Sequence, residues 1–188
     1  MLILASNSPR RRELLTGAGY KFKVHPAVSE EIVPSLKPEK AAIVTAESKA
    51  SEVSAIFPGD IVLAADTIVV LNGEIMNKPR DPDDALRMLR CLSGVRHTVI
   101  TGVVIIGAGK TRAFFQRTSV EFNRLTDTEI RAYIKTGEPF DKAGAYGIQE
   151  KGALLVKGVR GDYFNVMGLP IARTAEALAD FGVYPEWN

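Results

Sequence analysis

The sequence predicts an α/β protein whose helices flank a long mixed β-sheet. Apolar runs typical of strands alternate with helical segments along the whole chain. Two long β-like segments, residues 96–106 and 112–123, are joined by Gly107-Ala108-Gly109 as in a hairpin. Because the 188 residues contain no repeat, linker or low-complexity tract, we expect a single domain over residues 1–188.

Capping and turn residues delimit the elements in order. Ser8 as N-cap and Pro9 in the first helical position open a helix, Asn72-Gly73 is a two-residue hairpin turn, and Thr126 with Glu129 forms a capping box. The expected strands are residues 2–5, 20–25, 61–71, 74–77, 96–106, 112–123 and 153–159. The expected helices are residues 9–18, 38–57, 83–91, 126–135 and 170–181. The apolar face of the second helix consists of Ala42, Ile43, Ala46, Ala50 and Val53.

Composition and charge exclude several classes of protein. Hydrophobic residues make up 46% and charged residues 24% of the chain, values typical of a globular protein. The formal net charge of +2 gives no bulk affinity for nucleic acid or membranes. The single cysteine, Cys91, cannot form an intramolecular disulfide and fits a reducing compartment. The N-terminal apolar run is too short for a signal peptide or a membrane span, so we expect a soluble cytoplasmic protein.

Arginines stand where a helix disfavours them. Arg10, Arg11 and Arg12 lie in the first turn of the expected helix and oppose its dipole. The free N–H groups of a helix N-terminus, together with arginines, can also bind phosphate. The tripeptide is therefore either an anion site or a solvated basic turn.

A second unusual residue is Asp66, which lies inside the apolar run 61–71. A buried carboxylate must be paired, hydrogen-bonded, metal-bound or protonated. Asp66 is therefore either a general base or metal ligand at a strand end facing a cleft, or an aspartate that satisfies a neighbouring backbone.

Other charged residues allow two interpretations each. Lys49 lies next to the apolar face of its helix and can reach inward, although lysines are normally solvated. Lys78-Pro79-Arg80 and Asp141-Lys142 are open to the same two interpretations. Glu30-Glu31 is either a surface pair or a pair of carboxylates that holds a divalent cation among phosphates.

Several familiar sites are excluded. Gly109-Lys110-Thr111 is similar to the end of a P-loop, but Val104 stands five residues before Gly109, where a glycine is required. His25 and His97 lack the spacing of a zinc site. The sequence also contains no GxSxG motif and no strand–GxGxxG–helix unit.

Six motifs spread over the whole chain together resemble the Maf family. They are Ser6-Asn7-Ser8-Pro9-Arg10-Arg11, Ala65-Asp66-Thr67-Ile68-Val69, Asn77-Lys78-Pro79-Arg80-Asp81, Leu92-Ser93-Gly94, Asp141-Lys142-Ala143-Gly144-Ala145-Tyr146-Gly147-Ile148-Gln149 and Asn165-Val166-Met167-Gly168-Leu169-Pro170. The resemblance implies a nucleoside triphosphate pyrophosphatase with a fold like that of the inosine triphosphatase group, with two lobes around a central cleft. It also implies a homodimer and a divalent metal such as Mg, Mn or Co.

The resemblance also implies roles for particular residues. Such enzymes release pyrophosphate and leave the monophosphate, so water attacks the α-phosphorus. Asp66 maps onto the catalytic aspartate, which we expect to activate that water, and Glu31 maps onto an acidic position that shares the metal with Asp66. The positions that map onto phosphate contacts are Ser6, Arg11, Lys49 and Lys78.

Base choice resembles that of the branch of the family that acts on dTTP and UTP. The matching set is Arg10, Thr67 and Gln149, and the amide of Gln149 has the donor and acceptor that suit uracil or thymine. Gln149 could instead only brace its loop. Two other functions stay open: a 7-methyl-GTP pyrophosphatase of the same family, whose sequence differs around residues 141–149, and a non-catalytic regulator of cell division at the septum.

Overall fold

The computed structural model describes residues 1–28 and 36–187. Its helices are α1 (Pro9–Gly17), α2 (Pro38–Ile56), α3 (Pro82–Leu92), α4 (Asp127–Ile134), α5 (Tyr163–Met167) and α6 (Ile171–Ala179). Its strands are β1 (Leu2–Leu4), β2 (Lys23–Val24), β3 (Ile61–Leu71), β4 (Glu74–Met76), β5 (Arg96–Gly107), β6 (Lys110–Phe122) and β7 (Val156–Arg160). Between α4 and β7 lie the 3₁₀ helices η1 (Glu138–Asp141), η2 (Ala143–Ala145) and η3 (Glu150–Leu155). Over the described ranges, no helix has both the length and the apolar composition needed to cross a bilayer.

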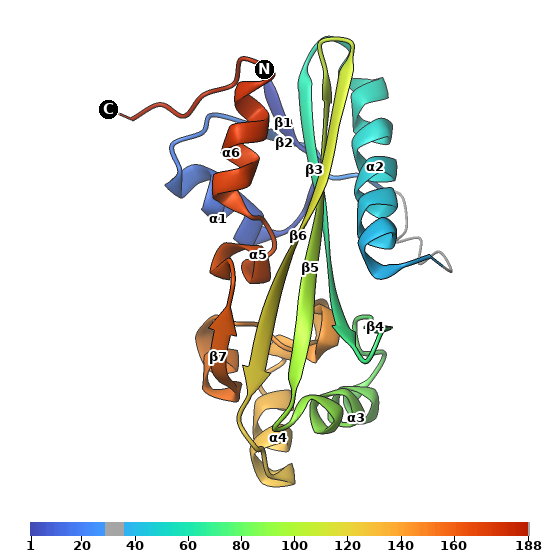
Figure 1. Ribbon diagram of the computed structural model, residues 1–188, viewed down its shortest axis with the longest axis vertical. Coiled ribbons are helices and arrows are strands. Elements are labelled where there is room, and N and C mark those ends of the chain that lie inside the picture. Colours follow the sequence, from blue (N-terminus) through green and yellow to red (C-terminus); the bar gives the residue numbers. More distant parts are fainter. Residues whose placement is uncertain (29–35, 188) are drawn as a thin grey trace. The chain divides into compact units, whose positions relative to one another are not determined.

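The strands of the described residues form one mixed sheet. Their order is β2-β1-β3-β5-β6-β7, and β4 pairs with β3 beside this path. β1 runs parallel to both β2 and β3, whereas β4 is antiparallel to β3 and β7 is antiparallel to β6. Figure 1 shows β5 and β6 as long neighbouring strands joined by a tight turn. The predicted mixed sheet with flanking helices is confirmed.

The chain divides into two compact units. Unit 1 comprises residues 1–66, 101–116 and 168–188, and unit 2 comprises residues 67–100 and 117–167.

In unit 1, α2 packs on the sheet through small side chains. A Cβ on Gly102 of β5 would lie 2.5 Å from the carbonyl carbon of Ala42 in α2, so the absence of a side chain at Gly102 allows this close approach.

The core of unit 2 is rich in aromatic and large aliphatic side chains. α3 packs against α4, and both contribute buried residues to one cluster that also contains Phe122 and Tyr146. His97 is buried in β5, and its ring meets the rings of Phe122 and Tyr146 edge-on, with centroids 5.0 and 5.4 Å apart. Such edge-to-face pairs add to the free energy gained by burial.

The local signals in the sequence are confirmed. The Ser8 side chain accepts a hydrogen bond from the Arg11 N–H at the start of α1, with Pro9 as the first helical residue. Both bonds of the capping box between Thr126 and Glu129 are present at the start of α4. Asn72 and Gly73 have φ of 52° and 87° in the turn between β3 and β4, as a hairpin turn of this type requires.

Two expectations about the strands need correction, whereas Ile43 packs against the core with the rest of the apolar face of α2, as expected. The strand expected over residues 20–25 is only the two-residue β2. The strand expected over 153–159 begins only at Val156, because residues 150–155 form η3. The short helix α5 was not predicted; the Asp162 side chain accepts the N–H groups of Phe164 and Asn165 at its start.

Candidate active site

The Asp66 carboxylate is buried and paired with a lysine. Asp66 lies in the middle of β3 and not at a strand end as expected, because the strand continues to Leu71, and only 6% of its surface is exposed. The Nζ atom of Lys49 lies 2.7 Å from Asp66 Oδ1, and 14% of the lysine side chain is exposed. Because the ammonium group compensates the charge, the carboxylate can be buried in an apolar strand. Of the two interpretations of Lys49, the one in which the side chain reaches inward is confirmed.

The packing of α2 explains how Lys49 reaches Asp66. Ala46, Ala50 and Val53 are completely buried and pack with Val62 and Ala64 of β3. These short side chains bring the helix axis close to the sheet. A lysine at the margin of that face therefore extends its chain along the interface and reaches the strand.

A second polar cluster of unit 1 joins Ser6 and Arg11. The Arg11 guanidinium donates from Nη1 to Ser6 Oγ over 3.0 Å and from Nε to the Gly168 carbonyl over 2.8 Å. Ser6 Oγ also accepts the Ser8 N–H over 3.2 Å. These bonds fix the plane of the guanidinium at the first turn of α1, where a cation and helix N–H groups together suit an anion.

The parallel register of β1 and β3 places these two clusters at the same end of the strands. Leu4 pairs with Leu63, and the Ala5 N–H donates to the Leu63 carbonyl over 2.8 Å. The chain therefore leaves the sheet at Ser6, beside the stretch of β3 that leads to Asp66. The structure thus joins four of the predicted residues in two pairs, Ser6 with Arg11 and Lys49 with Asp66. Arg10 is half-buried in the same turn of α1.

Three further predicted residues lie in unit 2. Thr67 follows Asp66 in β3 and is half-buried, Lys78 is exposed just after β4, and Gln149 is half-buried immediately before η3. The Gly144 N–H donates to the Asn77 carbonyl over 3.1 Å. This bond joins the segment that carries Lys78 to the glycine-rich segment 141–149, which carries Gln149.

The segment 141–149 is anchored in the core of unit 2 through Tyr146. The Tyr146 hydroxyl and His97 Nε2 are hydrogen-bonded over 2.7 Å. Burial raises the pKa of Tyr146 above its ordinary value and lowers the pKa of His97 to about 4. Both side chains are therefore neutral at pH 7, as their apolar surroundings require.

Sequence reasoning missed the residues that hold the loop around Gln149. The Tyr133 hydroxyl accepts the Gly147 N–H, and the Glu138 carboxylate accepts the N–H groups of Lys151 and Gly152. Glu138 follows a helix end and precedes a proline, a context typical of a surface residue. Only its distant backbone partners show otherwise.

One predicted metal ligand, Glu31, lies outside the described residues. Within residues 1–28 and 36–187, no three His, Cys, Asp or Glu side chains are grouped as a metal site. Asp66 supplies one buried carboxylate. Mg²⁺ is often bound by one or two carboxylates together with substrate phosphates, so this donor fits such a cation.

Comparison with known proteins shows which protein family this chain belongs to. A family model described as Maf-like protein matches residues 1–181. The chain is 47% identical to a dTTP/UTP pyrophosphatase of Bacillus pumilus, with 98% of both chains covered. It is 50% identical to a dTTP/UTP pyrophosphatase of Moorella thermoacetica, with 97% of this chain and 95% of the relative covered. The protein is thus an α/β protein with a buried Asp–Lys pair between α2 and β3, and it belongs to the Maf family.

Other similar proteins include a dTTP/UTP pyrophosphatase of Anaeromyxobacter dehalogenans, which is 49% identical over 100% of this chain and 97% of the relative. Among solved structures, the Staphylococcus aureus Ham1 protein matches 64% of this chain and 71% of its own, with a TM-score of 0.45 and 18% identity. The family membership rests on the sequence matches.

Proposed function

We propose that this chain hydrolyses dTTP and UTP to the monophosphate and pyrophosphate, a housekeeping reaction of the nucleotide pool. The observation that carries the proposal is the buried Asp66 carboxylate, paired with Lys49 over 2.7 Å. It stands in a Maf-family chain whose relatives bear the name dTTP/UTP pyrophosphatase.

In the proposed reaction, Asp66 is the general base. Its carboxylate accepts a proton from water, and the water oxygen attacks the α-phosphorus. The bond from that phosphorus to the bridging oxygen breaks, and pyrophosphate leaves. Lys49 holds Oδ1, which leaves Oδ2 to receive the proton.

The phosphates are assigned to cationic and hydroxyl donors. Arg11 is oriented by Ser6 and by the Gly168 carbonyl, so less conformational entropy is lost when it binds an anion. Ser6, Lys78 and the remaining donors of Lys49 complete the proposed set. Their positive charge would offset the negative charge that develops on the triphosphate.

A divalent cation is part of the proposal. Asp66, with the expected contribution of Glu31, would hold Mg, Mn or Co, and the cation would polarise the phosphates. Chelation by excess EDTA should abolish pyrophosphate release, and added Mg²⁺ or Mn²⁺ should restore it. Full activity in EDTA would remove the metal from the proposal.

Base choice is assigned to Arg10, Thr67 and Gln149. The Gln149 amide can donate to a pyrimidine carbonyl and accept from the ring N3–H. Cytosine cannot reciprocate, because its N3 is an acceptor.

The proposal also includes a cytoplasmic homodimer that binds neither nucleic acid nor membranes. The free, exposed Cys91 supports a reducing compartment.

The test is hydrolysis in H₂¹⁸O of a panel containing UTP, dTTP, CTP, GTP and 7-methyl-GTP. We expect pyrophosphate and the monophosphate, the highest kcat/KM for UTP and dTTP, and the ¹⁸O label in the monophosphate. Label in pyrophosphate would place the attack on the β-phosphorus and contradict the role of Asp66. Preference for 7-methyl-GTP, or a folded protein without turnover, would favour the two other functions.

A further inference from the structure

The loop that carries Gln149 is closed at its base by two backbone segments in contact. A Cβ built on Gly152 would lie 2.0 Å from the carbonyl oxygen of Gly147 and 2.9 Å from the Tyr133 hydroxyl. Glu150, inside the loop, has φ of 54°, in the left-handed region that non-glycine residues rarely adopt. We call residues 147–152 the base loop. Its two ends are in contact, its backbone is strained at Glu150, and side chains from outside the loop bind its N–H groups.

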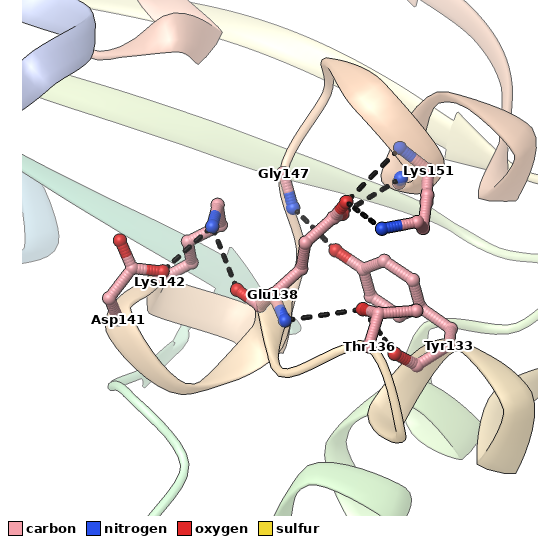
Figure 2. A network of polar contacts seen from close by, with 8 residues as sticks. Tyr133, Thr136, Glu138, Asp141, Lys142, Gly147 and Lys151 are labelled. Carbon is pink, nitrogen blue, oxygen red and sulfur yellow. Dashed lines mark hydrogen bonds and ion pairs between the residues drawn. The ribbon is translucent and has the colours of Figure 1, made fainter.

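Glu138 holds the C-terminal end of the base loop. Its carboxylate accepts the Lys151 N–H at Oε1 over 3.3 Å and the Gly152 N–H at Oε2 over 3.2 Å. Figure 2 shows this side chain extended toward the start of η3, with the Lys151 ammonium beside it. Only 10% of the Glu138 side chain is exposed, and the Lys151 Nζ atom is 3.9 Å away. The backbone N–H groups are therefore its main partners.

Tyr133 holds the N-terminal end of the base loop. Its hydroxyl accepts the Gly147 N–H over 3.1 Å. Burial raises the pKa of Tyr133, and a hydrogen bond with Glu138 raises it further, while the bond from Gly147 lowers it. The phenol is thus protonated at neutral pH, and Figure 2 shows its hydroxyl bonded to the Gly147 N–H.

Glu138 is itself fixed by the turn after α4. The Glu138 N–H donates to Thr136 Oγ1 over 3.2 Å, and that hydroxyl donates to the Tyr133 carbonyl over 2.7 Å. Lys142 Nζ donates to the Glu138 carbonyl over 2.7 Å. Gly137, with φ of 80°, supplies the left-handed turn that glycine adopts without cost. These bonds therefore fix the backbone that carries the Glu138 carboxylate.

We infer that Glu138 and Tyr133 are positioning residues for base selection. They hold the two ends of the base loop so that the Gln149 side chain, which takes no part in this network, keeps one orientation for the substrate base. This inference rests on the proposed function, in which Gln149 recognises uracil or thymine. Without the hydrogen bonds from Glu138 and Tyr133, the base loop would sample other conformations. Gln149 would then lose its preference for uracil or thymine before catalysis failed.

The test compares kcat/KM for UTP with that for CTP in the full-length protein. Glu138→Ala should reduce the UTP/CTP ratio by about 10-fold, because two backbone N–H groups lose their acceptor. In the Gln149→Ala background, the same change should alter the ratio by less than about twofold. Glu129→Ala is the matched control, since it removes a carboxylate cap of similar kind from α4 and should leave the ratio unchanged.

A second measurement keeps the inference separate from the proposed function. Hydrogen exchange of the Lys151 and Gly152 amides should quicken about 10-fold in Glu138→Ala, and not in Glu129→Ala. If Glu138→Ala does not fold, Tyr133→Phe decides, with a smaller fall in the ratio and faster exchange at Gly147. A wild-type protein that prefers UTP while both variants keep its ratio overturns the inference alone. A wild-type protein with equal kcat/KM for UTP and CTP overturns the proposed role of Gln149 and the inference with it.

Discussion

Two regions hold their polar side chains by different means. In unit 1, Lys49 and Asp66 belong to a long helix and a long strand, and they meet side chain to side chain over 2.7 Å. In unit 2, Gln149 lies between the short 3₁₀ helices η2 and η3, and the base loop contains no α-helix or strand. It is held by side chains that bind backbone N–H groups.

This difference predicts that substitutions in the two regions have different consequences. A pair set between α2 and β3 depends on the packing of a whole interface, so its geometry tolerates little variation. A loop held by three hydrogen bonds can shift after one substitution while the core of its unit stays intact. We therefore expect catalysis to depend on unit 1 and base choice to be adjustable in unit 2.

The largest effect is expected for Asp66→Asn. The amide has nearly the shape of the carboxylate but cannot take a proton from water, so kcat should fall by about 100- to 10,000-fold. Asp60→Asn is the control: it makes the same change one residue before β3, where the carboxylate pairs with the N-terminal ammonium. Near-wild-type pyrophosphate release from folded Asp66→Asn would contradict the assignment of the base.

The next effect is expected for Arg11→Ala, at about 100-fold in kcat/KM. The loss should be equal for all triphosphates, because the guanidinium is assigned to phosphate. Arg12→Ala, one residue further and exposed, should change little. A reordered nucleotide preference in Arg11→Ala would show that this arginine contacts the base.

The sequence was informative wherever the signal is local. Ser8 and Thr126 are helix caps, and both act within three residues. Asp66 could be singled out because a carboxylate in an apolar run demands a partner, and Lys49 because it borders an apolar helix face. The phosphate and base contacts came from resemblance to a family, and the structure brings together only some of those residues.

The remainder depends on partners far apart in sequence. Arg11 is oriented by the Gly168 carbonyl, 157 positions away. Residues 153–155 have the composition of a strand, but η3 forms there. Glu138 binds the first N–H groups of η3 from 13 and 14 residues upstream. No pattern within a short window contains that information.

A smaller effect, confined to base choice, is expected for Gln149→Ala. Loss of the amide leaves a substrate carbonyl and N3–H unpaired, which together cost about 1–3 kcal/mol. The kcat/KM for UTP and dTTP should fall by about 5- to 100-fold, and that for CTP much less. Gln149→Glu keeps the shape without the donor and should lose the same preference, whereas equal losses for UTP and CTP would indicate that Gln149 does not contact the base.

No effect on turnover at pH 7 is expected for His97→Gln. His97 instead affects the stability of the folded state in acid. Burial lowers its pKa in the folded state to about 4, from 6.5 in the unfolded chain. The folded state thus favours neutral histidine, and the resulting stability is complete above pH 6.5 and is lost as the pH falls toward 4. The loss amounts to at most about 3 kcal/mol.

Urea unfolding at several pH values would measure this loss, with His97→Gln as the variant that cannot titrate. The difference in stability between wild type and variant should shrink steadily below pH 6.5. Hydrogen exchange should show the loosening in the core of unit 2 before that of unit 1. A constant difference across this range would mean that His97 does not carry the acid sensitivity.

The separation of catalysis from base choice is tested most directly by one ratio measured in two variants. The kcat/KM for UTP divided by that for CTP should be unchanged in Asp66→Asn, although both values are low. In Gln149→Ala the same ratio should approach one while turnover of CTP is largely kept. A ratio that changes in Asp66→Asn, or that survives in Gln149→Ala, would contradict the assignment of the two roles to two regions.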